Sequence, residues 1–324
     1  MLSIDKLHQT FESYLKKNKI VKNPQTLYNP FNYIMSIGGK RMRPLLTLLS
    51  CQLFDEDIKQ ALPAALSVEV FHNFSLVHDD IMDEALLRRG HTTVHEKYGL
   101  NSAILSGDAM LIYSYDFLQQ TPKKSIIGEM VNILGKVAIK VCEGQQYDID
   151  FESGSSISLD AYLKMIEMKT AVLLAGSLEL GALAGGAPPE DRQHLSEFGR
   201  LTGLAFQIQD DYLDTFGDPA KFGKRIGGDI AQNKKTCLYI KALERADKET
   251  KKQLLSLYNT SNDDEHKIKT VTMIFRKLGI PDFIKNLRDE YQQKAYQHLH
   301  LVKAPAAAKS LIKDLAASLL IREL

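Results

Sequence analysis

The chain has 324 residues, of which 44% are hydrophobic and 25% charged, with a formal net charge of +1. That near-neutral balance, without a long run of like charge, gives no electrostatic reason to expect a nucleic-acid partner. The three cysteines lie far apart and lack metal-ligand spacing, which favours free thiols in a reducing compartment over a disulfide framework. We therefore expect a cytoplasmic protein that does not bind nucleic acid.

The sequence contains no convincing membrane or export segment. Residues 1–20 are amphipathic and charged throughout, so they lack the apolar core of a secretory signal. The most apolar long window, residues 170–189, contains Glu179 and several glycines and is barely long enough to span a bilayer. This window is predicted to be a buried helix, without membrane insertion.

Apolar residues recur at helical spacing along almost the whole chain, and alternating β-type runs are nearly absent. Neither a tandem repeat nor a low-complexity linker divides it. The prediction is therefore an all-α protein, a single large helical bundle formed by one domain over residues 1–324. The predicted helices are 3–18, 41–54, 60–83, 101–119, 125–150, 159–185, 190–213, 232–244, 248–259, 265–278, 281–300 and 305–322.

The first candidate site residues lie in GGKRMRP, residues 38–44, where a glycine pair precedes a helix. The start of a helix favours anions, and this one offers Lys40, Arg41 and Arg43. A solvated basic loop is the simpler interpretation of this segment taken alone.

The predicted helix 60–83 ends in the acidic cluster of Asp79, Asp80 and Asp83. Residues three and four apart share a helix face, so these carboxylates project together, and His72 lies on the same stripe two turns earlier. The segment LRRGH follows directly and supplies Arg88 and Arg89.

The helix predicted over 159–185 contains the pair Lys169 and Thr170, in which a lysine enters a strongly apolar segment. The alternative to a functional lysine here is a side chain whose ammonium group reaches out to solvent from a helix end.

A second acidic cluster, at identical spacing, lies near the end of the helix predicted over 190–213. It consists of Asp210, Asp211 and Asp214, and Gln207 precedes it by one turn. A basic segment, residues 221–236, follows this cluster and contains Lys221, Lys224, Arg225, Lys234 and Lys235.

Either acidic cluster alone is typical of a solvated helix end, but two DDxxD copies on apolar helices indicate a metal site. Carboxylates at this density repel one another unless a cation lies between them. Hard oxygen ligands suit Mg²⁺, which keeps several waters and bridges to substrate phosphates. An EF-hand is disfavoured because neither cluster has the glycine-punctuated loop. The resulting hypothesis is two facing helices that each hold Mg²⁺ with a diphosphate between them, and with the basic segments completing the anion site.

With these motifs in hand, the chain resembles the trans-type polyprenyl diphosphate synthases, the farnesyl and geranylgeranyl diphosphate synthase family. The resemblance implies an all-α bundle around a deep central cavity and a homodimer. It rests on six motifs in order, GGKRMRP, EVFHNFSLVHDDIMD, LRRG, the KT pair, FQIQDDYLD and GKRIGGDIAQNKKT.

The resemblance also implies a role for each matching residue, with about three Mg²⁺ ions in each active site. Metal binding is implied for Asp79, Asp80, Asp83, Asp210 and Asp214. Contacts to isopentenyl diphosphate are implied for Lys40, Arg43, His72 and Arg89. Contacts to the allylic diphosphate are implied for Arg88, Lys169, Lys224 and Lys234, and Thr170 and Gln207 are implied to lie near the developing cation.

The expected reaction is ionisation of an allylic diphosphate, attack by the double bond of isopentenyl diphosphate, and loss of a proton. In the family, residues shortly before the first cluster limit the length of the product. Here Phe74 and Ser75 are the fifth and fourth residues before Asp79, and DDIMD carries no insertion. This pattern resembles geranylgeranyl diphosphate synthases of archaeal type, with farnesyl diphosphate as the alternative product; ordinary core packing is the alternative role for Phe74.

Two other functions are alternatives to prenyl transfer. A class I terpene cyclase ionises the same substrate, but its second metal motif is usually of the Asn/Ser/Glu type, whereas this chain has a second DDxxD. A non-catalytic subunit of a heteromeric synthase typically lacks one aspartate motif, and both are intact here.

Overall fold

The computed structural model describes residues 1–54, 57–153, 157–218, 226–259 and 265–320, and within them the all-α prediction is confirmed. The helices are α1 (Ile4–Lys17), α2 (Gln25–Ser36), α3 (Met42–Gln52), η1 (Ile58–Gln60), α4 (Leu62–Met82), α5 (Val94–Tyr98), α6 (Leu100–Gln119), η2 (Lys124–Ile126), α7 (Ile127–Ser153), α8 (Leu159–Ile166), η3 (Glu167–Ala171), α9 (Val172–Ala184), α10 (Pro189–Phe216), α12 (Gly228–Ala231), α13 (Cys237–Arg245), α14 (Lys248–Tyr258), α15 (Glu265–Lys277), α16 (Ile280–Leu301) and α17 (Ala306–Leu320). Two short strands, β1 (Leu87–Arg88) and β2 (His91–Thr92), pair in antiparallel register.

Several local features differ from the predicted elements. Helices α5 and α12 lie outside the predicted helices, and α13 begins at Cys237, five residues after the start predicted at 232. Helix α2 was not predicted, because Pro24 and Pro30 argue against a helix there; Pro30 nevertheless lies in its second turn, and the helix buries Phe31. The single helix predicted over 159–185 is interrupted by η3, a π-helical turn. The β1–β2 hairpin was not predicted either, since two-residue strands leave no periodic signal.

The density of internal contacts divides the chain into two compact units. Unit 1 comprises Met1–Lys136, Gly176–Ser196 and Leu301–Leu315, and unit 2 comprises Val137–Ala175, Glu197–His300 and Ala316–Leu324. Each unit draws on three separate stretches of the chain. The single domain over 1–324 and the deep central cavity stay predictions.

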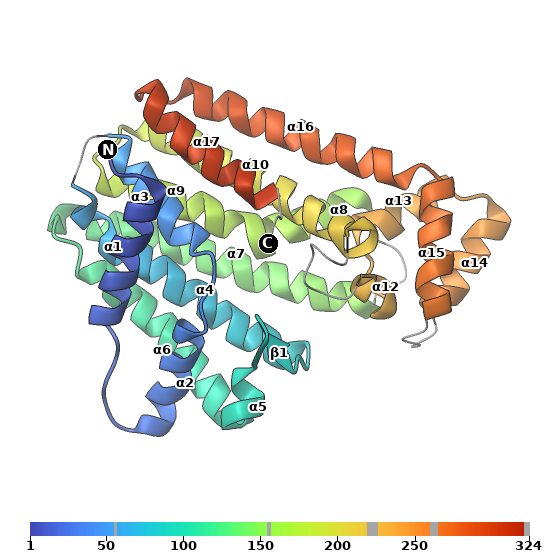
Figure 1. Ribbon diagram of the computed structural model, residues 1–324, viewed down its shortest axis with the longest axis horizontal. Coiled ribbons are helices and arrows are strands. Elements are labelled where there is room, and N and C mark those ends of the chain that lie inside the picture. The colour runs from blue at the N-terminus through green and yellow to red at the C-terminus, as the bar shows by residue number, and fades with distance from the viewer. Residues whose placement is uncertain (55–56, 154–156, 219–225, 260–264, 321–324) are drawn as a thin grey trace. The chain divides into compact units, whose positions relative to one another are not determined.

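In unit 1, α4 packs along α6 and against α3 (Figure 1). Most of α4 is buried, including Leu66 and Phe71, as its apolar sequence predicts. A Cβ added to Gly181 would lie 2.0 Å from the carbonyl oxygen of Thr47, so only glycine allows α9 to approach α3 this closely. This packing holds the C-terminal end of α4, and with it the first aspartate cluster.

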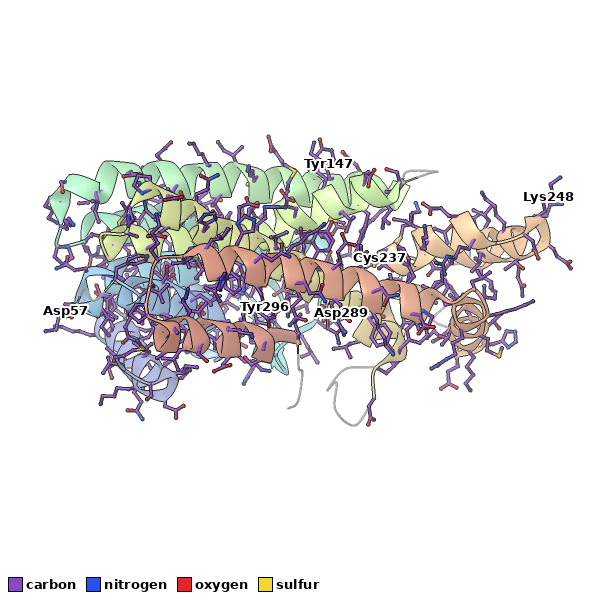
Figure 2. All side chains as sticks on the ribbon, turned by 90° about the horizontal axis from the view of Figure 1, so that it is seen from above. Asp57, Tyr147, Cys237, Lys248, Asp289 and Tyr296 are labelled. Carbon is purple, nitrogen blue, oxygen red and sulfur yellow. The ribbon has the colours of Figure 1, made fainter. Side chains whose placement is uncertain are left out.

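In unit 2, α8, α10, α13 and α15 share an apolar core that includes Ile208, Leu238 and Phe275. Cys237, where α13 begins, belongs to this core and is fully buried, whereas Lys248 at the start of α14 projects into solvent (Figure 2). The second aspartate cluster lies on the last turns of α10 and therefore borders this core.

Helix α9 confirms the prediction of a buried helix within residues 170–189, since nearly all of its residues are buried. Among the described helices, none combines the length and the apolarity that a membrane crossing needs.

Candidate functional site

The first aspartate cluster lies where α4 ends, and its three carboxylates face different surroundings. Asp80 is fully buried, Asp79 is partly buried, and Asp83, the C-cap residue, is exposed. The C-terminal end of a helix carries partial negative charge, so three acids there are unfavourable unless cations offset them.

Arg88 supplies one such cation. Its Nε and Nη2 donate to Asp80 Oδ1 at 2.9 and 2.5 Å, and Nη2 lies 3.9 Å from Asp79 Oδ2. Burial raises the pKa of Asp80 and the hydrogen bonds from Arg88 oppose that rise. The chain turns directly after α4, where the backbone N–H of Ala85 donates to the carbonyl oxygen of Asp80 at 2.9 Å, and Arg88 follows on β1 within reach of α4. Asp80 and Arg88 are thus partners of each other, while Asp79 and Asp83 form the more open face of the cluster.

A group of cationic and polar side chains gathers elsewhere in unit 1. Arg43 Nη1 lies 3.0 Å from His72 Nε2. Arg89 donates to the carbonyl oxygen of Gly38, and a Cβ on Gly39 would lie 2.9 Å from the Arg89 guanidinium carbon. We call Arg43, His72 and Arg89 the cationic cluster.

The pKa values of the cationic cluster record its positive potential. Burial lowers the pKa of Arg43 to about 10, Glu69 opposes this, and Arg89 adds to it. Burial and then the neighbouring arginines lower the pKa of His72 well below its usual value, so the imidazole is neutral. Because His72 Nε2 accepts from Arg43, its proton is on Nδ1 and can be donated. The cluster is built to receive an anion.

The two remaining basic residues of GGKRMRP differ from each other. Lys40 is exposed. Arg41 is buried and donates to Glu12 at 3.0 Å, to Glu69 at 2.6 Å and to the carbonyl oxygen of Met35 at 2.7 Å. Arg41 therefore anchors the start of α3, and its acidic partners were missed because they lie far away in the sequence.

Phe74 is buried, with its ring centroid 5.5 Å from that of Phe71 and 5.0 Å from that of His78. Ser75 donates through Oγ to the carbonyl oxygen of His72 at 2.9 Å. His78 lies over Gly107 of α6, where a Cβ would be 2.2 Å from its Nε2. The ring of Phe74 is thus held from both sides within α4.

The second aspartate cluster shows the same division between outer and inner carboxylates. Asp210 and Asp214 are partly exposed, whereas Asp211 is 3% exposed. Asp214 Oδ2 accepts the backbone N–H of Asp229 at 2.9 Å, which joins α10 to the start of α12. Burial, followed by the charges of Asp214 and Asp211, raises the pKa of Asp229 well above its usual value.

Asp211 accepts hydrogen bonds from three neutral groups. The Tyr162 hydroxyl donates to its Oδ2 at 2.5 Å, and the Cys237 thiol lies 3.2 Å from the same oxygen. Gln207 Nε2 donates to Oδ1 at 3.2 Å. Burial raises the pKa of Asp211 to about 7, and these hydrogen bonds hold it below a still higher value. Tyr162 and Cys237 carried no signal in the sequence.

Lys169 and Thr170 lie in the π-helical turn η3, a distortion that is frequent at functional sites. Lys169 Nζ donates to Asp148 Oδ2 at 2.7 Å, so the lysine has an acidic partner in α7 that the sequence reasoning missed. Thr170 Oγ1 donates to Gln207 Oε1 at 3.3 Å, which brings together the two residues predicted near the allylic cation.

The basic segment after α10 is only partly visible. Lys221, Lys224 and Arg225 lie outside the described residues. The charge of Lys234 opposes the rise in the pKa of Asp229. Lys235 Nζ donates to the carbonyl oxygens of Phe151 and Glu152, both at 2.9 Å. Lys235 therefore provides hydrogen bonds to carbonyl oxygens at the C-terminal end of α7.

The donor sets of both clusters fit Mg²⁺ better than a transition metal. Across the described ranges, no group of three or more His, Cys, Asp and Glu side chains converges as it would around a fully protein-bound ion. Mg²⁺ usually binds one or two carboxylates and keeps its remaining positions for water and phosphate. The outer pairs, Asp79 with Asp83 and Asp210 with Asp214, match that requirement.

Comparisons with known proteins agree with this chemistry. The profile of the polyprenyl synthetase family matches residues 24–275. The short chain isoprenyl diphosphate synthase of Methanocaldococcus jannaschii is 38% identical over 84% of this chain and 81% of its own. The geranylgeranyl diphosphate synthase of Methanosarcina mazei is 35% identical over 94% of this chain and 92% of its own.

Solved structures are equally similar. A geranylgeranyl pyrophosphate synthase, for which no organism is specified, has a TM-score of 0.94 at 39% identity and covers 100% of both chains. The geranylgeranyl pyrophosphate synthetase of Pyrococcus horikoshii has a TM-score of 0.92 at 31% identity, covering 99% of this chain and 97% of its own.

Proposed function

The chain belongs to the polyprenyl synthetase family and is a prenyltransferase, and on that premise we propose that it condenses isopentenyl diphosphate with allylic diphosphates to all-trans geranylgeranyl diphosphate. The cationic cluster carries the proposal. Arg43, His72 and Arg89, three residues expected to hold isopentenyl diphosphate, form a positive region of unit 1 in which Arg43 and His72 are partly buried and Arg89 is exposed.

We assign the outer carboxylates to metal binding. Asp79 and Asp83 hold Mg²⁺ on unit 1, and Asp210 and Asp214 hold Mg²⁺ on unit 2, with about three ions in total. When bound, these ions neutralise the diphosphate that departs from the allylic substrate. Asp80 supports the first pair indirectly, since its carboxylate already accepts from Arg88.

The basic residues divide between the two substrates. In the proposal, Arg43 and Arg89 bind the diphosphate of isopentenyl diphosphate, neutral His72 donates through Nδ1–H, and exposed Lys40 adds a third cation. Arg88, Lys169, Lys224 and Lys234 bind the allylic diphosphate. Their charge favours the departure of the diphosphate over its retention.

The bond changes follow from this placement. The allylic C–O bond breaks, and its electron pair leaves with the diphosphate. The double bond of isopentenyl diphosphate then supplies the electrons of the new C–C bond, and the departed diphosphate accepts the proton that is lost. Thr170 and Gln207 offer oxygen lone pairs to the allylic cation, a role supported by their mutual hydrogen bond.

Phe74 limits the product to twenty carbons in this proposal, with Ser75 as the smaller neighbour. Its burial between Phe71 and His78 supports a fixed wall. Phe74→Ala is expected to lengthen the product, whereas an unchanged product distribution would remove Phe74 from this role. A farnesyl product from the wild-type enzyme would move the limit one isoprene unit shorter.

We further propose a cytoplasmic homodimer. All three cysteines are free thiols, which suits a reducing compartment. Helix α6 exposes Leu105 and Ile112, seven residues apart on one face, at 59% and 70% exposure. Light scattering should give twice the chain mass, and Ile112→Glu should shift it toward the monomer.

The deciding experiment supplies isopentenyl diphosphate and Mg²⁺ with dimethylallyl, geranyl or farnesyl diphosphate and separates the dephosphorylated alcohols. Geranylgeraniol from all three primers supports the proposal. Turnover without isopentenyl diphosphate would indicate a cyclase, and turnover only after a partner protein is added would indicate a subunit of a heteromeric enzyme.

A further inference from the structure

Asp211 has no role in the chemistry above, yet its burial is unusual for a carboxylate. It borders the unit 2 core, since its hydrogen-bond partners Tyr162 and Cys237 belong to that core and its own side chain is buried. A buried charge is unfavourable unless hydrogen bonds satisfy it. Within the described part of the chain, its hydrogen-bond partners, Tyr162, Cys237 and Gln207, are all neutral. Such a network stabilises the fold only when every donor in it points at an acceptor.

Donor and acceptor chemistry then determines how Gln207 is turned. The NH₂ group of Gln207, and not its oxygen, faces Asp211 and donates to its Oδ1 at 3.2 Å, and a carboxylate oxygen accepts this hydrogen bond. Gln207 Oε1 therefore points the other way, where Thr170 Oγ1 donates to it at 3.3 Å. Thr170 uses its single proton in that bond, which leaves its oxygen lone pairs free to face a substrate.

The surrounding backbone leaves this chain of hydrogen bonds little freedom. A Cβ on Gly203 would lie 2.5 Å from Ala171 Cα, so α10 approaches the π-helical turn closely. A Cβ on Gly144 would lie 2.3 Å from the backbone nitrogen of Lys169, so α7 approaches the same turn. Tyr162 on α8 and Cys237 on α13, the latter labelled in Figure 2, fix Asp211 Oδ2 from two further helices.

We propose that Asp211 is a positioning residue that locks the Gln207 amide, so that the reacting allylic group meets the oxygens of Gln207 and Thr170 and never the Gln207 amide hydrogens. The inference rests on the proposed prenyl transfer. Amide hydrogens directed at a carbocation would destabilise the transition state, whereas preorganised oxygens stabilise it. Asp211 thus acts through Gln207 and touches no substrate.

The test compares Asp211→Asn with Tyr162→Phe at pH 8 and saturating Mg²⁺. Asparagine is isosteric but can accept or donate, so Gln207 becomes free to flip. We expect kcat to fall about 10- to 100-fold while each substrate KM changes less than about twofold. Tyr162→Phe removes a donor from Oδ2 but keeps the Oδ1 contact with Gln207. This matched control should unfold at lower denaturant concentration yet retain kcat within about threefold.

A second background separates positioning from metal binding. Gln207→Met, similar in volume but without an amide, should lower kcat by the same factor as Asp211→Asn. Adding Asp211→Asn to Gln207→Met should lower it by less than about twofold more, because the two residues act as one unit. If Asp211→Asn fails to fold, the kcat values of Gln207→Met and Tyr162→Phe are compared instead. The inference then requires that Gln207→Met loses more kcat than Tyr162→Phe.

Three results would overturn the inference: a full additional loss in the double variant, a rise in the half-saturating Mg²⁺ concentration for Asp211→Asn, or equal kcat losses for Gln207→Met and Tyr162→Phe. A wild-type enzyme that forms no prenyl product would instead overturn the proposed function itself. Wild-type turnover is measured first, so the two failures are distinguishable.

Discussion

Asp80 and Asp211 occupy the same position in two identically spaced DDxxD motifs, and both are buried, yet the protein satisfies them in opposite ways. Asp80 forms an ion pair with Arg88, with Nη2 at 2.5 Å. Asp211 accepts from a phenol, a thiol and an amide, none of which is charged. Repetition of a motif therefore does not imply repetition of its electrostatics.

The outer carboxylates differ less between the two clusters. Asp79 and Asp210 are both partly exposed. Asp83 caps α4 and is open to solvent, whereas Asp214 also holds the backbone N–H of Asp229. In each motif we propose the outer residues as metal ligands, whereas the inner residue is hydrogen-bonded to protein groups.

The largest expected effect separates outer from inner residues. Asp79→Ala and Asp210→Ala should each lower kcat roughly 10³-fold, because each removes a carboxylate that we propose as a metal ligand, worth several kcal/mol of transition-state stabilisation. Asp80→Asn should lower kcat no more than about tenfold, since it keeps a hydrogen-bond acceptor for Arg88. Steady-state kinetics across a Mg²⁺ titration measures both. Equal losses of kcat for Asp79→Ala and Asp80→Asn would contradict the distinction between outer and inner carboxylates.

The next effect tests the ion pair of the first cluster by stability. Arg88→Ala should lower the free energy of unfolding by about 3 kcal/mol in urea without Mg²⁺, because it leaves the Asp80 carboxylate buried without its cation. Arg89→Ala is the matched control and should be milder, since the Arg89 guanidinium donates to the carbonyl oxygen of Gly38. Equal losses in the free energy of unfolding for the two variants would mean that the ion pair between Arg88 and Asp80 stabilises the protein no more than the Arg89 hydrogen bond does.

The neutral network of the second cluster should be less sensitive. Tyr162→Phe removes the shortest hydrogen bond to Asp211 and should lower the free energy of unfolding by about 1–2 kcal/mol. Cys237→Ala removes a weaker thiol donor and should lower it by less than about 1 kcal/mol. Urea unfolding of both variants measures this order, and the reverse order would contradict the assigned hydrogen bonds.

Near neutral pH, the smallest effect is the pH dependence contributed by His72. Its pKa is depressed in the folded protein by burial and by Arg43 and Arg89. As pH falls below the unfolded value of about 6.5, the unfolded chain takes up the proton first, so stability present above that pH is lost on acidification. The slope attributable to His72 approaches about 1.4 kcal/mol for each pH unit.

His72→Gln provides the check, because glutamine can accept from Arg43 but does not titrate. Urea unfolding of the Mg²⁺-free protein between pH 8 and pH 5 should show a shallower loss of stability for this variant. Parallel curves for the variant and the wild-type protein would mean that the pKa of His72 is the same in the folded and unfolded states.

Much of the fold was predictable from the sequence because helical periodicity is a local property. The apolar spacing located α4 and α10, and the buried α9 was expected from its composition. Helix α2 and the π-helical turn η3 were missed. Pro30 argues locally against a helix, and a π-helical turn depends on neighbours such as Gly144 and Gly203.

For the candidate site, the sequence by itself determined which acids share a helix face, because that follows from spacing alone. The family resemblance, and not the spacing, grouped Arg43 with His72 and Thr170 with Gln207, and each pair is in hydrogen-bond contact in the structure. Only the tertiary structure decided which carboxylate turns inward and what meets it. Tyr162 lies 49 residues from Asp211 in the sequence and Cys237 lies 26 residues away. Packing of α8, α10 and α13 brings their side chains together, and no local sequence pattern predicts contacts between residues so far apart in the chain.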